Sequence, residues 1–481
     1  TMPLREEITT QIIVGRDFED AKKFGSGGTI FLGRHLVGSG EDSHLTTPVL
    51  LDVLRPHVMI LCGKRGEGKC LHEDSIIVLN DGSCLPIKEL ENDKRSVISL
   101  NDELKIRPAE KTNFFKREVN QILHIKLRSG REIKLTPEHP LLTIKGWKQA
   151  VDLAIGSRIA TPREIEVFGS CEMPEHEIKL LAYLIAEGHI KSHDKRNIIR
   201  FANLDEFIIK EFYKCVEDFD SNLKVTQYRK DGFGVVKKKI IVKENIKRDE
   251  KGRIKEGIIE KNPLAVWLEK LNLYGKLSRE KFIPDCIFRL PKDKISLFLN
   301  RLFSCDGSIN KREGSWEISY CSSSKKMIRQ VQHLLLRFCI ISKIKEKNIK
   351  NNGKNFNSYE IIIASENVDI FIKEIGFFGK KEDRQKGALR NTKKRNPNID
   401  TIPHDVWDLY KPIDWARIGR ELGYVHPKAM RESIFYSPSR QKLLRIAKVE
   451  QNEALRLLAE SDIFWDEIVF MELLEGNFTV Y

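Results

Sequence analysis

Between residue 70 and about residue 165, apolar and polar side chains alternate in short runs, as in Ile122–Leu127 and Glu132–Leu135. A period of two places every second side chain on the same face, which predicts half-buried β-strands. Asn80–Gly82 and Ser129–Gly130 carry residues that favour tight turns between paired strands. Because no long amphipathic helical pattern interrupts these runs, we predict a small all-β unit.

The stretch from about 176 to 375 combines helical apolar spacing with cationic segments. Leu180–Gly188 and Leu299–Gly307 are apolar, and each closes with an acidic residue followed by glycine. An ordinary buried helix with a glycine at its C-terminus would produce the same pattern. Lys237–Lys243 and Lys343–Lys347 are strand-like and rich in lysine. We expect a unit of mixed helices and strands that contains two similar helices.

Residues 379–398 have the Lys/Arg/Asn-rich composition of a linker, and residues 403–460 predict compact helices. Two of these helices, near Trp415–Gly423 and Ser439–Ala447, are spaced much like a helix-turn-helix. The helical module is therefore either an additional DNA contact or a spacer. Residues 463–481 return to strand character.

Near the start of the chain, Val58–Cys62 predicts a buried strand that leads into Gly-Lys-Arg-Gly-Glu-Gly-Lys at residues 63–69. This pattern is typical of a phosphate-binding loop, which requires a Ser or Thr directly after the lysine to bind Mg²⁺, and then a helix. Cys70 stands in place of that hydroxyl, and a strand and a turn follow it in place of the helix. The simplest interpretation is that another protein has been inserted into the loop.

The formal net charge of +14 lies entirely after residue 69, because residues 1–69 carry nine basic and nine acidic side chains. A basic excess of this size favours a polyanionic partner, most simply nucleic acid. A length of 481 residues predicts about three domains. Nine cysteines without CxxC pairs argue against a disulfide framework or a zinc ribbon, and the sequence shows neither a signal peptide nor an apolar run long enough for a membrane span. We therefore expect a cytoplasmic protein without membrane contact.

The segment before Cys70 resembles the opening of archaeal HerA-type ATPases, in which the phosphate-binding loop follows a stretch such as Arg55-Pro-His-Val. The resemblance implies a partial α/β P-loop segment that belongs to an oligomeric, helicase-like host, which uses ATP and Mg²⁺. Once the interruption is removed and the loop rejoined, the ATP phosphates are expected to bind the loop residues Gly63, Gly66, Gly68 and Lys69.

Cys70, the turn at Asp81-Gly82 and the later Thr136-Pro-Glu-His139 resemble the N-terminal splicing motifs of inteins, which excise themselves and join their flanks. The resemblance implies an all-β, horseshoe-like Hint domain that needs no cofactor for splicing. It implies that the Cys70 thiol attacks the Lys69 carbonyl in an N–S acyl shift. His139 would protonate the departing amide nitrogen, and Thr136 would hold the amide by hydrogen bonding.

Inteins finish with a block that runs from roughly Val-Tyr-Asp-Leu through His-Asn to an acceptor Ser, Thr or Cys. Residues 462–481 resemble this block as far as Thr479-Val-Tyr481. The resemblance therefore implies a missing C-terminal intein and flanking segment, supplied in cis or in trans. Because the interrupted loop itself requires Ser or Thr at the junction, one hydroxyl would serve both as the acceptor and as the Mg²⁺ ligand.

The two helices that end in an acid and a glycine resemble the paired LAGLIDADG motifs of homing endonucleases, and Lys281-Phe-Ile-Pro and Ser322–Phe338 match further blocks in the same order. The resemblance implies a two-repeat αββαββ fold that cuts double-stranded DNA at a specific site. Glu187 and Asp306 would bind Mg²⁺, which activates water and stabilises the leaving oxygen. Lys281 would lie near the scissile phosphates.

These features predict a multidomain α+β chain whose basic strands, near 225–243 and 343–363, follow the major groove of DNA. The predicted divisions are the ATPase flank, the first Hint part, the endonuclease, the basic linker with the helical module, and the start of the last Hint part, at residues 1–69, 70–170, 171–378, 379–460 and 461–481. Two alternatives are a P-loop ATPase with a non-splicing insertion and a hedgehog-type autoprocessing Hint domain that does not splice.

Overall fold

A computed structural model describes residues 11–14, 16, 18–37, 44–52, 69–190, 197–239, 242–248, 250, 254–312, 315–351, 354–389, 399–412 and 414–481. It separates into two compact units, Thr1–Glu67 and Gly68–Tyr481. The strand predicted at Val58–Cys62 and the loop glycines Gly63, Gly66 and Gly68 lie outside the described residues.

The first unit contains a small mixed α/β segment. Its elements are β1 (Ile12–Val14), α1 (Phe18–Phe24), β2 (Thr29–Val37) and β3 (His44–Asp52). Strand β3 lies between a parallel β1 and an antiparallel β2. The guanidinium of Arg16 donates a 2.6 Å hydrogen bond to the carboxylate of Asp52, and the pair ties the residues after β1 to the end of β3.

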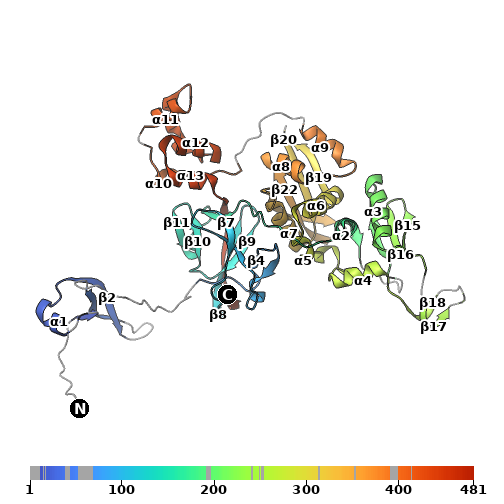
Figure 1. Ribbon diagram of the computed structural model, residues 1–481, viewed down its shortest axis with the longest axis horizontal. Helices are drawn as coiled ribbons and strands as arrows, with labels where there is room; N and C mark the ends of the chain where they lie inside the picture. Colours follow the sequence, from blue (N-terminus) through green and yellow to red (C-terminus); the bar gives the residue numbers. More distant parts are fainter. Residues whose placement is uncertain are drawn as a thin grey trace, which may run out of the picture. The chain divides into compact units, whose positions relative to one another are not determined.

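Short strands and turns form the second unit from residue 70 to 162, as the period-two pattern predicts. The strands are β4 (Ile76–Val78), β5 (Cys84–Pro86), β6 (Val97–Leu100), β7 (Ile106–Ala109), β8 (Arg117–Leu127), β9 (Glu132–Leu135), β10 (Pro140–Thr143), β11 (Gly146–Gln149) and β12 (Arg158–Pro162). The main antiparallel sheet has the order β12-β23-β8-β9, and β23 (Ile463–Val480) comes from the far end of the chain (Figure 1). Between residues 70 and 162 the helical structure consists of single 3₁₀ turns at Ile87–Glu89 and Ala150–Asp152.

Strand β8 places apolar side chains on both faces of the sheet. The side chains of Leu123, Ile125 and Leu127 contribute to one apolar core. Ile122 points to the opposite face, where it packs with Cys70. Successive side chains of a strand point to opposite faces, so the strand that builds the core also supports Cys70.

The middle of the second unit consists of two halves with the same order of elements, drawn in green and in yellow to orange in Figure 1. The first half contains α2 (Glu175–Glu187), β13 (Gly188–His189), β14 (Ile199–Ala202), α3 (Glu206–Phe219), β15 (Leu223–Arg229) and β16 (Gly232–Lys237). The second half contains α6 (Lys292–Asp306), β19 (Gly307–Arg312), β20 (Ser315–Ser322), α7 (Lys325–Leu336), β21 (Lys343–Asn351) and β22 (Lys354–Ala364). Their sheets have equivalent strand orders, β13-β14-β16-β15 and β19-β20-β22-β21, which agree with the predicted αββαββ repeats.

Connecting elements surround these halves. They are β17 (Val242–Arg248), β18 (Ile254–Ile259), α4 (Pro263–Lys270), a 3₁₀ turn at Ser278–Glu280, α5 (Asp285–Phe288) and α8 (Glu366–Glu374). The lysine-rich segment Lys237–Lys243 does not form one strand, because β16 ends at Lys237 and the next strand begins at Val242. Helices α2 and α6 pack against each other in a single core shared by the two halves.

The last part of the second unit is mostly helical. Its elements are α9 (Lys381–Leu389), α10 (Val406–Leu409), α11 (Trp415–Glu421), a 3₁₀ segment (Pro427–Phe435), α12 (Arg440–Glu450) and α13 (Glu453–Glu460). Two predictions need correction. The stretch 379–398 is not simply a linker, because its first part forms α9. The 3₁₀ segment also separates α11 from α12, so they are not joined by the short turn of a helix-turn-helix.

The fully buried side chain of Arg337, just after α7, joins the β part of the second unit to the two-halved part. It donates a 2.6 Å hydrogen bond to the carbonyl of Phe288 and another to the carbonyl of Gly82 in the β4–β5 turn. The Ser129 carbonyl, in the β8–β9 turn, accepts a 2.9 Å hydrogen bond from the Ile344 amide. A buried guanidinium is stable only where partners satisfy its donors, so the two turns are fixed against the second half.

We expect Gly82→Ala to lower the free energy of unfolding by roughly 2–4 kcal/mol. Gly82 has a φ of +89°, and a Cβ there would lie 2.3 Å from the carbonyl oxygen of Phe288. The matched control is Gly146→Ala, because Gly146 has a φ of +97° and open space around its Cβ position. The control should cost only the backbone term of about 1–2 kcal/mol. Urea unfolding measures both, and equal losses would contradict the contact with Phe288.

Candidate splicing and endonuclease sites

Cys70 is buried, with 5% of its surface exposed, and Thr136 holds its backbone. The Cys70 amide donates a hydrogen bond to Thr136 Oγ1 at 3.0 Å, and the Cys70 carbonyl accepts one from the Thr136 amide at 3.0 Å. The Cys70 amide nitrogen belongs to the Lys69–Cys70 peptide. The threonine hydroxyl therefore touches the bond that the sequence predicts to be cut.

The His139 imidazole is the second group at this peptide. Its position follows from a tight turn, in which the His139 amide donates to the Thr136 carbonyl at 3.0 Å. The buried Nδ1 of His139 has no hydrogen-bond partner among the residues that the structure describes. Burial lowers the pKa of His139 below its usual 6.5; contact with the Cys70 backbone opposes this shift, and the charge of Lys69 adds to it. The imidazole is therefore mostly neutral at pH 7.

Strand β23 brings the far end of the chain to the same place. Leu71 and Tyr481 exchange two backbone hydrogen bonds of 2.8 Å, and His72 pairs with Val480. Residues from both ends of the second unit thus lie beside Cys70. The sequence indicated strand character here but not the pairing partner.

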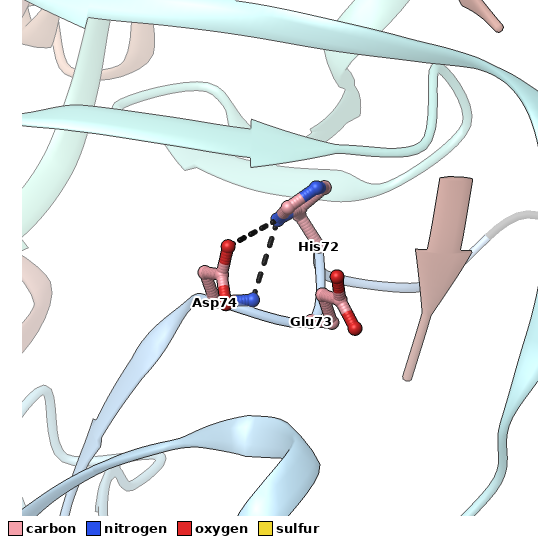
Figure 2. A group of neighbouring side chains, drawn as sticks. All are labelled: His72, Glu73 and Asp74. Atoms are coloured by element: carbon pink, nitrogen blue, oxygen red, sulfur yellow. Dashed lines mark hydrogen bonds and ion pairs between the residues drawn. The ribbon is translucent and has the colours of Figure 1, made fainter. Parts of the chain in front are cut away.

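Next to Cys70, the consecutive residues His72, Glu73 and Asp74 bring metal-ligand atoms within 4.8 Å of one another (Figure 2). Local contacts account for this group. The Asp74 amide donates to His72 Nδ1 at 3.3 Å, and the Asp74 carboxylate binds the Lys88 ammonium at 2.7 Å. Because the imidazole lone pair and one carboxylate are already used, we assign no metal to this group.

Glu187 and Asp306 are the last residues of α2 and α6, and the packing of these helices brings the two acids into one site. Burial raises the pKa of Glu187 to about 7. The hydrogen bond that the Asn203 side-chain amide donates to the Glu187 carboxylate opposes this rise, and the negative charge of Asp306 adds to it. Asp306 reaches solvent, yet the protein packed around it still raises the pKa of its carboxyl. Loss of water around the carboxyl groups thus favours their neutral forms.

Lys281 caps the helix that ends in Glu187. Its Nζ donates to the carbonyls of Leu184 and Ile185 at 2.9 Å and to that of Gly188 at 2.7 Å. Only 4% of the Lys281 surface is exposed, and burial lowers the pKa of its ammonium to about 8. An ammonium group has three donors, and all three are engaged. In this structure Lys281 fixes the helix end beneath the carboxylate.

Lys381 in α9 occupies the corresponding place at the other helix, and the sequence analysis missed it. Its Nζ donates to the carbonyls of Ser304 and Cys305, both at 2.6 Å, at the end of the helix that carries Asp306. Burial lowers the pKa of Lys381, while the neighbouring acids oppose this. The composition of residues 379–398 indicated a linker. The acidic residues directly after Lys381 could have indicated the start of a helix.

The two carboxylates suit a hard divalent cation. Their oxygen atoms are the ligand type that Mg²⁺ prefers. Both acids have raised pKa values because the protein packed around them displaces water from their carboxyl groups, and a bound cation would provide compensating positive charge. Glu187 and Asp306 thus fit the predicted role of magnesium ligands.

Of the predicted ATP-binding residues, the structure describes Lys69, whose side chain is exposed. The three glycines of the loop lie outside the described residues. Within the described part of the chain, none of the helices has both the length and the apolar character needed to cross a membrane.

Comparison with protein families identifies residues 293–376 as a match to the LAGLIDADG-like domain. This segment covers most of the second half, including Asp306. The first half, with Glu187, lies outside the matched residues. The family match therefore agrees with the predicted endonuclease motif at α6.

Two similar proteins are longer than this chain. The replicative DNA helicase DnaB of Synechocystis sp. is 29% identical over 423 residues, which are 84% of this chain and 46% of the helicase. The replication factor C small subunit of Methanocaldococcus jannaschii is 32% identical over 369 residues, 73% of this chain and 18% of that protein. The chain thus spans less than half the length of these relatives.

Among solved structures, a DnaB intein from Synechocystis sp. PCC 6803 is 31% identical to the aligned part of this chain. The alignment covers 20% of this chain and 69% of the intein, with a TM-score of 0.18.

Proposed function

We propose that the second unit is an intein that cuts the Lys69–Cys70 peptide, contains a homing endonuclease, and interrupts the phosphate-binding loop of an ATPase. One observation carries the splicing assignment. Cys70 is buried, Thr136 Oγ1 accepts a hydrogen bond from the amide of the Lys69–Cys70 peptide, and the half-buried His139 imidazole contacts the Cys70 backbone.

The similar proteins support an insertion. Only 69 residues precede Cys70, so an alignment of 423 residues with a helicase must lie mostly after it. A replication factor subunit also aligns with 73% of the chain, although its name denotes a different protein. A segment shared by differently named proteins is best explained as an element that has entered several hosts.

The first step exchanges an amide for a thioester. The neutral His139 imidazole takes the proton of the Cys70 thiol, and the sulfur attacks the carbonyl carbon of Lys69. The carbon–nitrogen bond then breaks, and the imidazolium returns the proton to the departing nitrogen, which becomes the free amine of Cys70. Thr136 keeps that nitrogen in place throughout. Atoms and charges balance without a cofactor.

Completion requires an acceptor hydroxyl or thiol and a residue that releases the intein. We propose that these come from sequence that continues after Tyr481, in cis or in trans, because the pairing of Leu71 with Tyr481 directs β23 toward Cys70. A Ser or Thr acceptor would also restore the Mg²⁺ ligand of the host loop.

Hydroxylamine tests the first step, because it cleaves a thioester but leaves an ordinary amide intact at neutral pH. Treatment of the purified chain should release residues 1–69 as a hydroxamate, which mass spectrometry identifies. Addition of a C-terminal segment should then produce a ligated host. Cleavage that is never followed by ligation would instead favour the hedgehog-type alternative, and a lack of both reactions would favour a non-splicing insertion.

The rate of hydroxylamine cleavage should depend on pH through His139. Because burial lowers the pKa of His139, the neutral base should persist below pH 6.5, and the rising limb of the rate profile should have its midpoint below that value. In the His139→Gln variant the rate profile should no longer show this rising limb. Cleavage should be slower by about 10²–10⁴-fold, the usual contribution of a general acid–base group. A midpoint above pH 6.5 would contradict the role of a half-buried neutral imidazole.

For the endonuclease we propose that Glu187 and Asp306 hold Mg²⁺, which supplies an activated water and charge stabilisation at the cleaved phosphate. Lys281 and Lys381 position the ends of the two helices through their carbonyl contacts. The exposed lysines of the two sheets would bind the phosphates of double-stranded DNA. The raised pKa of Glu187 implies that cation binding must displace a proton from part of the population at pH 7.

The host is proposed to be a HerA-type ATPase, on the basis of Arg55-Pro-His-Val and the loop that follows. Such a host would bind ATP and assemble into an oligomer only after ligation. Before ligation the loop has Cys70 where a Mg²⁺-binding hydroxyl is required, so the uncut chain should not hydrolyse ATP.

A further inference from the structure

The paired strands make it possible to compare the two halves of the endonuclease residue by residue. Gly188 pairs with Phe201 in the first half, and Gly307 pairs with Tyr320 in the second. Each glycine directly follows the acid of its helix. The same registers therefore define equivalent positions across both sheets.

At these equivalent positions the two sheets carry different residues on their outward faces. Arg200 of the first half corresponds to Ser319 of the second, and Arg229 corresponds to Lys345. The central-strand residue that pairs with Arg229 is Gly232 in the first half. In the second half it is Glu360, which binds the Lys347 ammonium at 2.6 Å.

The glycine makes room for an aromatic ring. A Cβ on Gly232 would lie 2.8 Å from the ring of Tyr228, so the tyrosine lies directly over the backbone at this position. The guanidinium carbons of Arg200 and Arg229 lie 5.8 and 5.4 Å from the ring centre, within the range of cation–π contacts. We call Arg200, Tyr228 and Arg229 the arginine shelf.

The shelf is open and adjoins the cleavage site. All three of its side chains are exposed, and 48% of the Tyr228 surface is accessible. A hollow of about 530 Å³ is lined by the shelf together with His189 and Glu187. Among the described residues, neither arginine forms an ion pair with a carboxylate, so both keep their charge available for an anion.

We propose that the arginine shelf binds a backbone phosphate of the DNA strand next to Glu187, and that the second half, which has Ser319 and Lys345 at the positions of the two arginines, lacks the paired-arginine contact. The proposal rests on the endonuclease function and adds an asymmetry to it. Guanidinium groups match phosphate geometry, and a flanking aromatic ring holds them in place. Loss of the shelf should therefore impair the first half of the site more than the second.

The binding test uses a short fluorescent duplex of the uninterrupted host junction, titrated at several salt concentrations. Each phosphate contact contributes about 0.9 to the slope of log affinity against log salt, so Arg200→Ala and Arg229→Ala should each reduce the slope by up to that amount. The charge-matched control is Arg107→Ala, which removes an exposed arginine of the β part. Gly232→Ala, which keeps all charges, should weaken binding by displacing the Tyr228 ring.

The cleavage test uses a supercoiled plasmid that carries the same junction. The wild-type chain should produce linear DNA, whereas the two arginine variants should accumulate nicked circles because one strand is cut more slowly. Unchanged slopes, or weaker binding to only one base sequence at an unchanged slope, would overturn the phosphate assignment. If even the wild-type chain does not cut, the endonuclease function fails, while a reduced salt slope would still support the shelf as a DNA contact.

Discussion

Hydroxylamine cleavage after Lys69 is expected to disappear completely when Cys70 is replaced by alanine. Cys70 is the proposed nucleophile, and the Thr136 hydroxyl, which among the described residues also contacts this peptide, is already engaged with the Cys70 backbone. A Cys70→Ser variant should retain slow cleavage, since a hydroxyl is a weaker nucleophile and a poorer leaving group than a thiol. Mass spectrometry of the released N-terminal fragment measures both.

The control is Cys171→Ala, which removes an exposed thiol and should leave the cleavage rate unchanged. Circular dichroism should show that all variants keep their strands, because the small Cys70 side chain contributes little to the core. Release of the fragment from the alanine variant at the wild-type rate would show that another residue begins the reaction. The splicing assignment would then be wrong.

Asp306→Asn is expected to remove Mg²⁺-dependent cutting of the uninterrupted host gene, with a loss on the order of 10³-fold, or about 4 kcal/mol in the barrier. The amide has nearly the shape of the carboxylate but lacks the charge that holds the cation. DNA binding should persist or strengthen, because one negative charge near the phosphates is gone. Plasmid linearisation measures cutting, and a gel-shift titration measures binding.

Asp293→Asn is the matched control, since Asp293 lies exposed in the first turn of the same helix, far along the sequence from Asp306. It should cut like the wild type. Cleavage of the Lys69–Cys70 peptide should be unaffected in both variants, because the two sites use different residues. Undiminished cutting by Asp306→Asn would exclude this residue as a cation ligand.

The sequence predicted those features that depend on local pattern. The period of two in residues 122–135 gave β8 and β9, and the two acid-glycine motifs fell at the ends of α2 and α6. The resemblance of Thr136-Pro-Glu-His139 to an intein motif led us to expect both side chains at the Lys69–Cys70 peptide, and Thr136 Oγ1 does accept a hydrogen bond from the Cys70 amide. Short-range spacing predicts strands and helix ends because the period of apolar residues sets which side chains share a face.

Features that depend on long-range contact were not predictable in this way. Nothing near Lys381 in the sequence shows that its ammonium caps the helix of Asp306, and its lysine-rich surroundings suggested a linker. The burial of Arg337 follows only from the approach of Gly82 and Phe288, which belong to different parts of the fold. The helix-turn-helix prediction was wrong because spacing alone did not reveal the 3₁₀ segment between α11 and α12.

If the second unit is the insertion proposed above, the backbone pairing of Leu71 with Tyr481 has a consequence for how it can move between genes. Leu71, directly after the proposed junction, and Tyr481 on β23 are hydrogen-bonded neighbours, so the second unit keeps these two strands as close together as the strands of a hairpin. A recipient can therefore accept hundreds of additional residues at one point in its chain while its own elements on either side stay near their native separation. Whether the recipient protein tolerates the inserted segment then depends on the local geometry of the insertion point rather than on the length of the segment.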